Sequence, residues 1–234
     1  MNMRVIADKK LFRKFEGLHV GVVVLKGIDN RGDDRKIFGL LEEVENFVRL
    51  NFTYEKLARS ATISSWRSAY DEFGERPEKY HCSVEGLMRN VLGGKAVRGA
   101  NKLQDVINYL SLKHIVPVGG FDLNSVNGNL RLCFASGKET FFDGKKRSRP
   151  SKGEVILKDD KEVASRKWNW KASHNFRLRA SSKDSIILID ALPPVSKATL
   201  TKIMEDLKDV AQMFVGGKFY QYILSEKQPE IVAE

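Results

Sequence analysis

The chain has 234 residues, of which 42% are apolar, and it carries 40 Lys or Arg against 30 Asp or Glu, a formal charge of +10. This length and apolar share allow one full hydrophobic core that needs neither a metal nor a disulfide for stability. The positive charge favours a polyanionic partner such as a nucleic acid, although a solvated basic surface with no such role would look the same.

The sequence also argues against a metal-binding or disulfide-bonded protein and against a membrane or secreted one. The two cysteines, Cys82 and Cys133, lie far apart and form no set with zinc spacing, so we expect free thiols in a reducing cytosol, no metal and no cofactor. No apolar run approaches the roughly 18 residues of a membrane span, and residues 1–15 lack a signal-peptide pattern. The sequence therefore predicts a soluble, cytoplasmic protein that contacts no membrane.

The first part of the chain contains both strand and helix patterns. β-branched and apolar residues predict strands over 3–7 and 18–28. Asp33 or Asp34 can cap a helix that follows, and a further helix is expected over 60–73. The apolar residues that recur at helical spacing after the cap are Ile37, Leu40, Leu41, Val44, Phe47 and Val48.

The middle of the chain changes from helices to short strands. Ser83 is a good N-cap for the next helix, Glu85 in its first turn favours the helix dipole, and Gly93-Gly94 ends it. Residues 101–113 then predict one more helix. The strands expected after it lie near 114–121, 129–135, 139–142, 154–158, 162–168 and 185–191.

The C-terminal part predicts one last helix. Pro193-Pro194 breaks the chain, Ser196 caps an amphipathic helix, and Gly216-Gly217 stop it. Helices thus come first, strands next and a helix last, which indicates an α+β fold rather than alternating βαβ units. We expect one domain over 1–234, in which 1–79 and 196–225 pack on a core at 80–195, with a frayed tail at 226–234.

The positive charge is concentrated in one segment. Residues 141–183 hold 13 Lys or Arg and five acids, and so carry +8 of the total +10. A concentrated patch supports a phosphate-binding face more strongly than a diffuse excess does. The stretch 144–153 predicts a mobile basic loop. Its expected RNA-binding residues are Lys145, Lys146, Arg147 and Arg149.

Two stretches suit a ligand with flat rings and negative charge. Residues 108–123 (NYLSLKHIVPVGGFDL) indicate the end of a helix and a buried strand that closes on Gly119-Gly120, where a ligand could approach the backbone closely. Residues 166–171 (RKWNWK) place two tryptophans among three cations. Together the two stretches point to the end of an RNA.

Five segments in a fixed order carry a resemblance to a known family. They are RPEKYHCSVEGLMRNVLGGK, VINYLSLKHIVPVGGFDL, GNLRLCFASGKETF, GEVILKDDKEVASRKWNWK and SIILIDAL. Over about 80–195 the chain resembles the tRNA-binding and editing domain of the phenylalanyl-tRNA synthetase β subunit, the pair called B-three/B-four. It is more similar still to free-standing proteins that consist of that domain alone.

The resemblance implies a three-layer α+β fold in which helices flank an unusual β-sandwich. It also implies a pocket for the aminoacylated 3′ end of tRNA and hydrolysis of wrongly charged amino-acid esters. In the synthetase-borne domain a histidine of the editing pocket stands at the position of Gly119, and a threonine at that of Ile107. The synthetase's own chemistry and its preference for tyrosyl esters should therefore not transfer. The chain lacks the aminoacylation domains, so we do not expect a complete synthetase.

Hydrolysis of such an ester needs a positioned water and a stabilised oxyanion rather than a nucleophilic side chain. The backbone N–H groups of Gly119 and Gly120 are the expected oxyanion donors, unless the pair only ends a strand. Asn108 and Ser111, three apart on one helix face, could orient water or hold the substrate, or they could satisfy nearby backbone groups. These four residues form the predicted catalytic set.

Four more residues are expected to bind the substrate. Asp122 could hold an α-ammonium group or form a turn, and Arg166 fits a carboxylate or a phosphate. Trp168 and Trp170 fall on one strand face. One of them could stack on the terminal adenine, a contact worth roughly 1–3 kcal/mol, or both could lie in the core.

The remaining candidates are basic. Lys167 and Lys171 fit backbone phosphates or are only solvated, and His174 could act as a general base or be an ordinary surface histidine. We expect one cavity to be lined by Asn108, Ser111, Gly119, Gly120, Arg166 and Trp168.

The leading hypothesis is a stand-alone protein that binds aminoacyl-tRNA and hydrolyses mischarged esters in trans. A second is a non-catalytic RNA-binding module of the same fold, which the missing histidine and threonine favour. A third is a pocket for a free amino acid or another small carboxylate, and the charge concentrated at 141–183 favours either RNA hypothesis over it.

Overall fold

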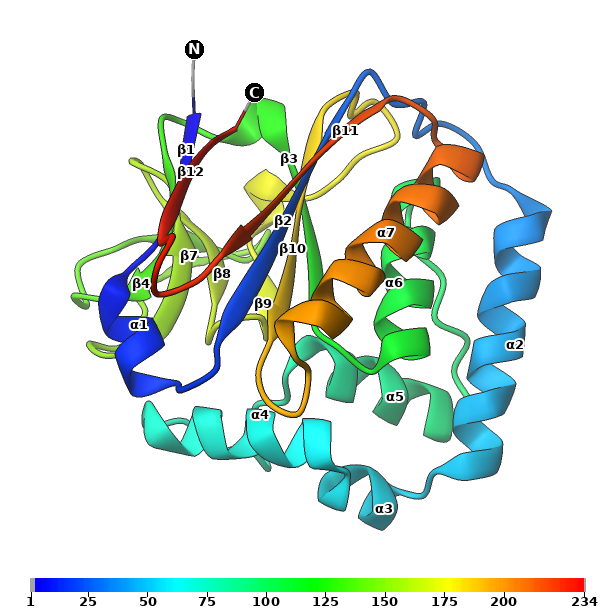
Figure 1. Ribbon diagram of the computed structural model, residues 1–234, viewed down its shortest axis with the longest axis horizontal. Helices are drawn as coiled ribbons and strands as arrows, with labels where there is room; N and C mark the ends of the chain where they lie inside the picture. Colours follow the sequence, from blue (N-terminus) through cyan, green and yellow to red (C-terminus); the bar gives the residue numbers. More distant parts are fainter. Residues whose placement is uncertain (1–2, 234) are drawn as a thin grey trace.

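We describe the chain from a computed structural model of residues 3–233. The α+β class predicted from the sequence is confirmed, because two β-sheets stack face to face and helices cover one of them (Figure 1). The helices are α1 (Lys9–Lys14), α2 (Arg35–Asn51), α3 (Tyr54–Arg59), α4 (Ala61–Glu72), α5 (Ser83–Leu92), α6 (Lys102–His114) and α7 (Lys197–Phe214). The strands are β1 (Met3–Ala7), β2 (His19–Lys26), β3 (Val118–Asp122), β4 (Leu130–Phe134), β5 (Phe141–Phe142), β6 (Arg147–Ser148), β7 (Val155–Lys158), β8 (Val163–Arg166), β9 (Lys171–Ala172), β10 (Ser185–Ala191), β11 (Lys218–Leu224) and β12 (Glu230–Ala233).

The two large sheets form a sandwich. Six strands make up one sheet in the order β12-β1-β4-β7-β8-β9, and four make up the other in the order β11-β2-β10-β3. Because side chains alternate along a strand, one face of the four-stranded sheet packs on the first sheet, where Val22 and Leu188 join Leu132 in the main core. The opposite face presents Val23 and Ile187 to the helices.

Helices α6 and α7 form the third layer of the fold. Leu110 of α6 and Leu207 of α7 are fully buried against the outer face of the four-stranded sheet, and α2 lies beyond α6 (Figure 1). Helices α3, α4 and α5 close one end of the sandwich, where Leu57, Trp66 and Met88 join the core between the sheets. This arrangement confirms the three layers that the resemblance implied.

Several helix starts follow from side-chain caps. Asp34 accepts a hydrogen bond from the Lys36 N–H at the start of α2, and Ser196 accepts one from Thr199 at the start of α7. The expectation for Ser83 is wrong. Cys82 is the N-cap residue, Ser83 is the first residue of α5, and no side chain caps this helix.

Three expectations about loops and ends need correction. The stretch 144–153 is not simply a loop, because Phe141 and Phe142 pair with Ser148 and Arg147 in a short hairpin. The helix α7 is not the last element, since β11 returns along β2. The segment 226–234 is not a frayed tail either. Its residues 230–233 form β12, which pairs with β1 and is an edge strand of the six-stranded sheet, while residue 234 lies outside the described residues.

Sequence patterns also missed the short helices α1 and α3. They have six residues each and bury only one or two side chains, which is too little to produce a periodic pattern. Within residues 3–233 no helix combines the length and the apolar character that crossing a membrane requires.

Candidate functional site

A cavity of about 180 Å³ lies between the two sheets, at the end of the sandwich that α5 and α6 flank. Residues from both of these helices, from strands of both sheets and from the turn between β8 and β9 line it. Its apolar wall consists of Val118, Phe121, Leu132, Leu157, Trp168, Trp170, Ala172 and Leu188. Its polar or glycine positions are Ser83, Gln104, Gly119, Gly120, Ser165, Asn169 and Asp190.

Unsatisfied polar atoms gather in this cavity. Six buried side-chain polar atoms among residues 3–233 have no hydrogen-bond partner, and three of them belong to residues that line it: Ser83 Oγ, Trp168 Nε1 and Asp190 Oδ1. Buried polar groups in proteins are almost always paired, so each exception calls for an explanation. A concentration of donors and an acceptor around one hollow is the arrangement that a small polar ligand would complete.

Asp190 is the one carboxylate of the cavity. It lies within β10, next to the last residue of the strand. Its own N–H donates to the Pro117 carbonyl, and its Oδ2 accepts a hydrogen bond of 3.0 Å from Asn169 Nδ2. Burial raises the pKa of Asp190 to about 6, although the Asn169 amide and the nearby Trp168 indole act in the opposite direction. The indole is thus close to the carboxyl group, yet neither Trp168 Nε1 nor Asp190 Oδ1 completes a hydrogen bond.

A strained turn between β8 and β9 places Trp168 and Asn169 in the cavity wall. Lys167 and Trp168 have φ angles of 46° and 61°, in the left-handed region that residues other than glycine seldom occupy. Hydrogen bonds hold the turn: Tyr70 Oη donates to the Lys167 carbonyl at 2.7 Å, and the Trp168 N–H donates to the Val155 carbonyl at 2.6 Å. Backbone strain that is held this firmly is characteristic of functional sites.

The ring of Trp168 lies in the core rather than at the surface. It is 1% exposed, and its centroid lies 4.8 Å from that of Phe15 and 4.9 Å from that of Trp66. This burial among aromatic rings leaves Trp168 poorly placed to stack on a nucleobase. Trp170 is half-buried at the cavity and meets Tyr80 edge-on at 4.9 Å, so it remains the tryptophan that a base could reach.

The two glycines of β3 face different layers. A Cβ at Gly119 would meet only the Phe121 ring, at 3.4 Å, whereas a Cβ at Gly120 would lie 2.4 Å from Ile107 Cδ1 and 2.7 Å from Leu178 Cδ1. The ladder to β10 also separates their N–H groups. Its alternation directs the Gly119 N–H toward Leu188 and only the Gly120 N–H away from β10. The pair therefore cannot supply two oxyanion donors.

Asn108 and Ser111 do not line the cavity. Asn108 Oδ1 accepts a hydrogen bond from Gln104 Nε2 at 3.0 Å, and Ser111 Oγ donates to the Val116 carbonyl at 2.6 Å. Both side chains thus satisfy local groups of α6 and the segment after it. Of this helix only Gln104, one turn before Asn108, reaches the cavity.

Asp122 is structural. Its Oδ1 accepts the Asn124 N–H, and its Oδ2 accepts the Ser182 hydroxyl at 2.7 Å. Both carboxylate oxygens are therefore engaged in fixing the turn after β3. The expected α-ammonium site does not lie at this residue.

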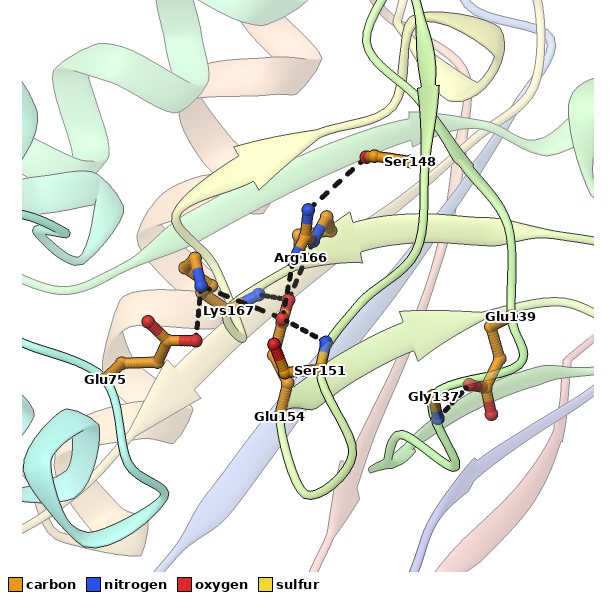
Figure 2. Close-up of polar contacts among 8 residues, drawn as sticks. All are labelled: Glu75, Gly137, Glu139, Ser148, Ser151, Glu154, Arg166 and Lys167. Carbon is orange, nitrogen blue, oxygen red and sulfur yellow. Dashed lines mark hydrogen bonds and ion pairs between the residues drawn. The ribbon is translucent and has the colours of Figure 1, made fainter.

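Arg166 and Lys167 are engaged in a buried charge network that we call the Glu154 network: Glu75, Glu154, Arg166 and Lys167 (Figure 2). Arg166 binds Glu154 with both ends of its fork, at 2.7 and 2.9 Å. Lys167 pairs with Glu75 and Glu154, and its Nζ lies 4.1 Å from the centroid of the Tyr80 ring. Neither cation is free for a phosphate or a carboxylate, so the sequence expectation is wrong for both.

The other basic candidates differ in their exposure. Lys171 is half-buried, with its Nζ 3.4 Å from Asp143 Oδ2. His174 is exposed and meets Phe142 edge-on at 6.0 Å, away from the residues that line the cavity. The four exposed cations of the β5–β6 hairpin and the segment after it are Lys145, Lys146, Arg147 and Arg149.

The sequence patterns did not identify five polar residues of the cavity: Ser83, Gln104, Ser165, Asn169 and Asp190. Asp190 offered a signal, because a lone carboxylate within the apolar run of 185–191 is unusual in a buried strand. The sequence pattern around Ser83 indicates a helix cap rather than a cavity residue. Nothing in the sequence around Gln104 and Asn169 indicates that they line a cavity. Among residues 3–233 no three His, Cys, Asp or Glu gather in positions that could hold a metal ion.

Comparisons with known proteins bear on the family. A family model described as the B3/4 domain matches residues 65–211. No curated protein matches the chain. Among solved structures, an N-terminal fragment of the phenylalanyl-tRNA synthetase β subunit from Pyrococcus horikoshii is 13% identical, with a TM-score of 0.47 over 95% of this chain and 54% of that one. This chain thus spans about half the length of that fragment.

The resemblance that the sequence segments indicated is confirmed by the family model. Since the model covers more than half of the 234 residues, the chain belongs to the B3/4 domain family.

Proposed function

We propose that the protein binds the aminoacylated 3′ end of a tRNA and hydrolyses the ester of a mischarged amino acid. The observation that carries this proposal is the cavity in which Ser83, Trp168 and Asp190 each leave a polar atom without a partner. Membership of the B3/4 family supports it, since that is the domain which the sequence resembles in the synthetase β subunit.

The size of the cavity fits an aminoacyl group rather than a nucleotide. An enclosed apolar cavity of about 150 Å³ is known to accept a benzene molecule, and the present cavity measures about 180 Å³. An amino-acid side chain would lie against the apolar wall of Leu132, Leu157 and Leu188. The nucleotide would remain outside, beside the half-buried Trp170.

The reaction needs little from the side chains. Water adds to the ester carbonyl, the bond from the acyl carbon to the ribose oxygen breaks, and the products are a free amino acid and a tRNA with a 3′ hydroxyl. The developing oxyanion requires donors in place beforehand. In this cavity the Ser83 hydroxyl, which has no partner, is suited to that task.

A non-catalytic RNA-binding module is the second candidate. The observation that favours it is the lining of the cavity, which includes no histidine and no threonine. Ile107, which stands where the synthetase-borne domain has threonine, is 1% exposed and packs in the helical layer, away from the cavity.

The test is deacylation of a panel of mischarged tRNAs by the wild type and by Gly119→His. We expect the wild type to release amino acid from at least one of them. The variant should lose most of this activity, because a Cβ fits at Gly119 and the imidazole would fill the cavity. Its tRNA affinity should stay nearly unchanged, since phosphate contacts lie elsewhere.

Two other outcomes would change the conclusion. Salt-dependent tRNA binding without release of any amino acid would favour the non-catalytic module. Failure to bind tRNA at all would leave the cavity as a pocket for a free small molecule.

A further inference from the structure

We propose that Asp190 accepts the α-ammonium group of the bound amino acid, so that the site takes aminoacyl esters with a free amino group and rejects N-acylated ones. The proposal rests on the proposed function for its choice of ligand. The geometry that carries it, a buried carboxylate without a counter-ion at the wall of a cavity, is independent of the reaction.

Asp190 has no cation to compensate it. It is 6% exposed, and it forms no ion pair with any residue of 3–233. The cations that flank Trp168 and Asn169 in the sequence are engaged by other carboxylates: Arg166 and Lys167 by Glu154, and Lys171 by Asp143. A buried carboxylate without a counter-ion is costly, and a ligand that brings a cation would remove that cost.

The neighbours of Asp190 fix which of its oxygens is available. Asn169 Oδ1 accepts a hydrogen bond from the Ser83 N–H at 3.4 Å, and Tyr70 Oη, whose proton goes to the Lys167 carbonyl, lies 3.1 Å from the same oxygen. Because the Ser83 N–H donates to Oδ1, the other end of the amide, Nδ2, points to Asp190 Oδ2. Oδ1 of Asp190 is left without a partner at the wall of the cavity.

An organic ammonium suits this position better than a metal ion does. Hard metal ions take about six or more oxygen ligands, and no three carboxylate, histidine or cysteine side chains of residues 3–233 gather here. A primary ammonium needs fewer partners and forms a strong charge-assisted hydrogen bond with one carboxylate oxygen. The apolar wall that includes Leu157 and Leu188 would hold the carbon skeleton beside it.

N-acylation would remove both features that the site recognises. It converts the ammonium into a neutral amide with one N–H, and it adds bulk beside Asp190 in the wall of the cavity. The site would then discriminate between free aminoacyl groups and their N-acylated counterparts whatever their side chain.

The experiment measures binding of small probes by calorimetry, in the absence of tRNA. The probes are alaninamide, leucinamide and phenylalaninamide, each beside its N-acetyl derivative. We expect at least one free amide to bind and its N-acetyl form to bind about 10- to 100-fold more weakly, the worth of one hydrogen bond to a charged group.

Asp190→Asn should reduce binding of that amide to the level of its N-acetyl form. Asp122→Asn is the matched control: Asp122 is also 6% exposed, but both its oxygens have partners and it does not line the cavity. Binding by this variant should equal that of the wild type. The comparison of amide with N-acetyl amide needs no variant, so a folding defect cannot obscure it.

The proposal is overturned if no free amide binds at millimolar concentration, if free and acetylated amides bind equally, or if Asp190→Asn binds as the wild type does. These outcomes are separate from failure of the proposed function. Binding of amides without tRNA deacylation would contradict the proposed hydrolysis and support the ammonium site. Equal deacylation of aminoacyl-tRNA and N-acetyl-aminoacyl-tRNA would support the proposed hydrolysis and contradict the ammonium site.

Discussion

Two buried polar regions meet at the turn between β8 and β9, and they are built in opposite ways. In the Glu154 network every charge has a partner, with Arg166 and Lys167 set against Glu75 and Glu154 (Figure 2). In the adjoining cavity, polar atoms of Trp168 and Asp190 have none. The first region holds the strained turn in place, and the second is where a ligand can still contribute interactions.

The difference shows why a cluster of cations in a sequence is a poor guide to ligand binding. Arg166 and Lys167 stand next to Trp168 in the chain, yet Glu154, just before the neighbouring strand β7, binds both of them. Glu154 itself is fully buried and also accepts the N–H groups of Lys167 and Ser151. Which charges remain available depends on such partners from distant positions.

Breaking the paired region should have the largest effect. Glu154→Gln removes the charge that both cations share, and breaking a buried pair typically costs about 3–5 kcal/mol. We expect the free energy of unfolding from urea denaturation to fall by that amount. Asp29→Asn is the control, because Asp29 and Arg31 form an ion pair of 2.9 Å whose two side chains are exposed, and losing such a pair should scarcely change the free energy of unfolding. Similar losses in both variants would show that the Glu154 network is not special.

Removing the unpaired charge of Asp190 should raise the free energy of unfolding rather than lower it. The pKa of Asp190 is raised from 3.8 to about 6, so the native state binds its proton more tightly than the unfolded state does. Its contribution to stability is therefore lost as the pH rises from about 4 to about 6, and stays lost above that range. Two pKa units correspond to about 3 kcal/mol.

We therefore expect Asp190→Asn to be about 3 kcal/mol more stable than the wild type at pH 7.5, with no difference below about pH 4. Urea denaturation of both proteins at several pH values measures this. A variant that is less stable at pH 7.5 would mean that the carboxylate has a partner after all.

Much of the fold could be predicted from the sequence, because its signals are local. The cap Asp34, the apolar period of α7 and the β-branched run of β2 depend only on neighbouring residues. The strand β12 could not be predicted in this way, since it forms by pairing with β1 at the other end of the chain.

The site was harder to predict than the fold. Gly119, Gly120, Trp168 and Trp170 do line the cavity, because the two stretches that contain them belong to facing sheets. Asp122 and Asp190 show how far the sequence alone can predict a site residue. Both are buried carboxylates at strand ends, and only the positions of Ser182 and Asn169 in space decide that the first is satisfied and the second is not.

The two glycines of β3 separate a tightly packed region from the cavity, and substitutions there should change stability less than those at Glu154 or Asp190. Gly120→Ala should destabilise the protein by about 1–3 kcal/mol, because its Cβ would overlap Ile107 in the tightly packed helical layer. Gly119→Ala should change stability by less than about 1 kcal/mol, because a Cβ there is in ordinary contact with Phe121. Thermal unfolding of both variants decides the matter. Equal losses would mean that no free space adjoins Gly119.

The exposed cations should matter least for stability. Lys145, Lys146, Arg147 and Arg149 are exposed to solvent, in contrast to Arg166 and Lys167. Their joint replacement by Ala should change the free energy of unfolding by less than about 1 kcal/mol. If they bind phosphates, tRNA affinity should fall, and the slope of log affinity against log salt should shrink by about 0.7–0.9 for each phosphate that is no longer neutralised.

A control of equal charge separates this interface from a general attraction. Four exposed lysines of α7 and β11 can be replaced by Ala together: Lys197, Lys202, Lys208 and Lys218. Both variants lose four positive charges, so the long-range attraction of a protein of net charge +10 for tRNA falls equally in the two. Only direct phosphate binding distinguishes them, and it alone reduces the salt slope stepwise. We expect the α7–β11 variant to keep the wild-type slope. The same reduced slope in both variants would remove the hairpin from the interface and leave net charge as the whole explanation.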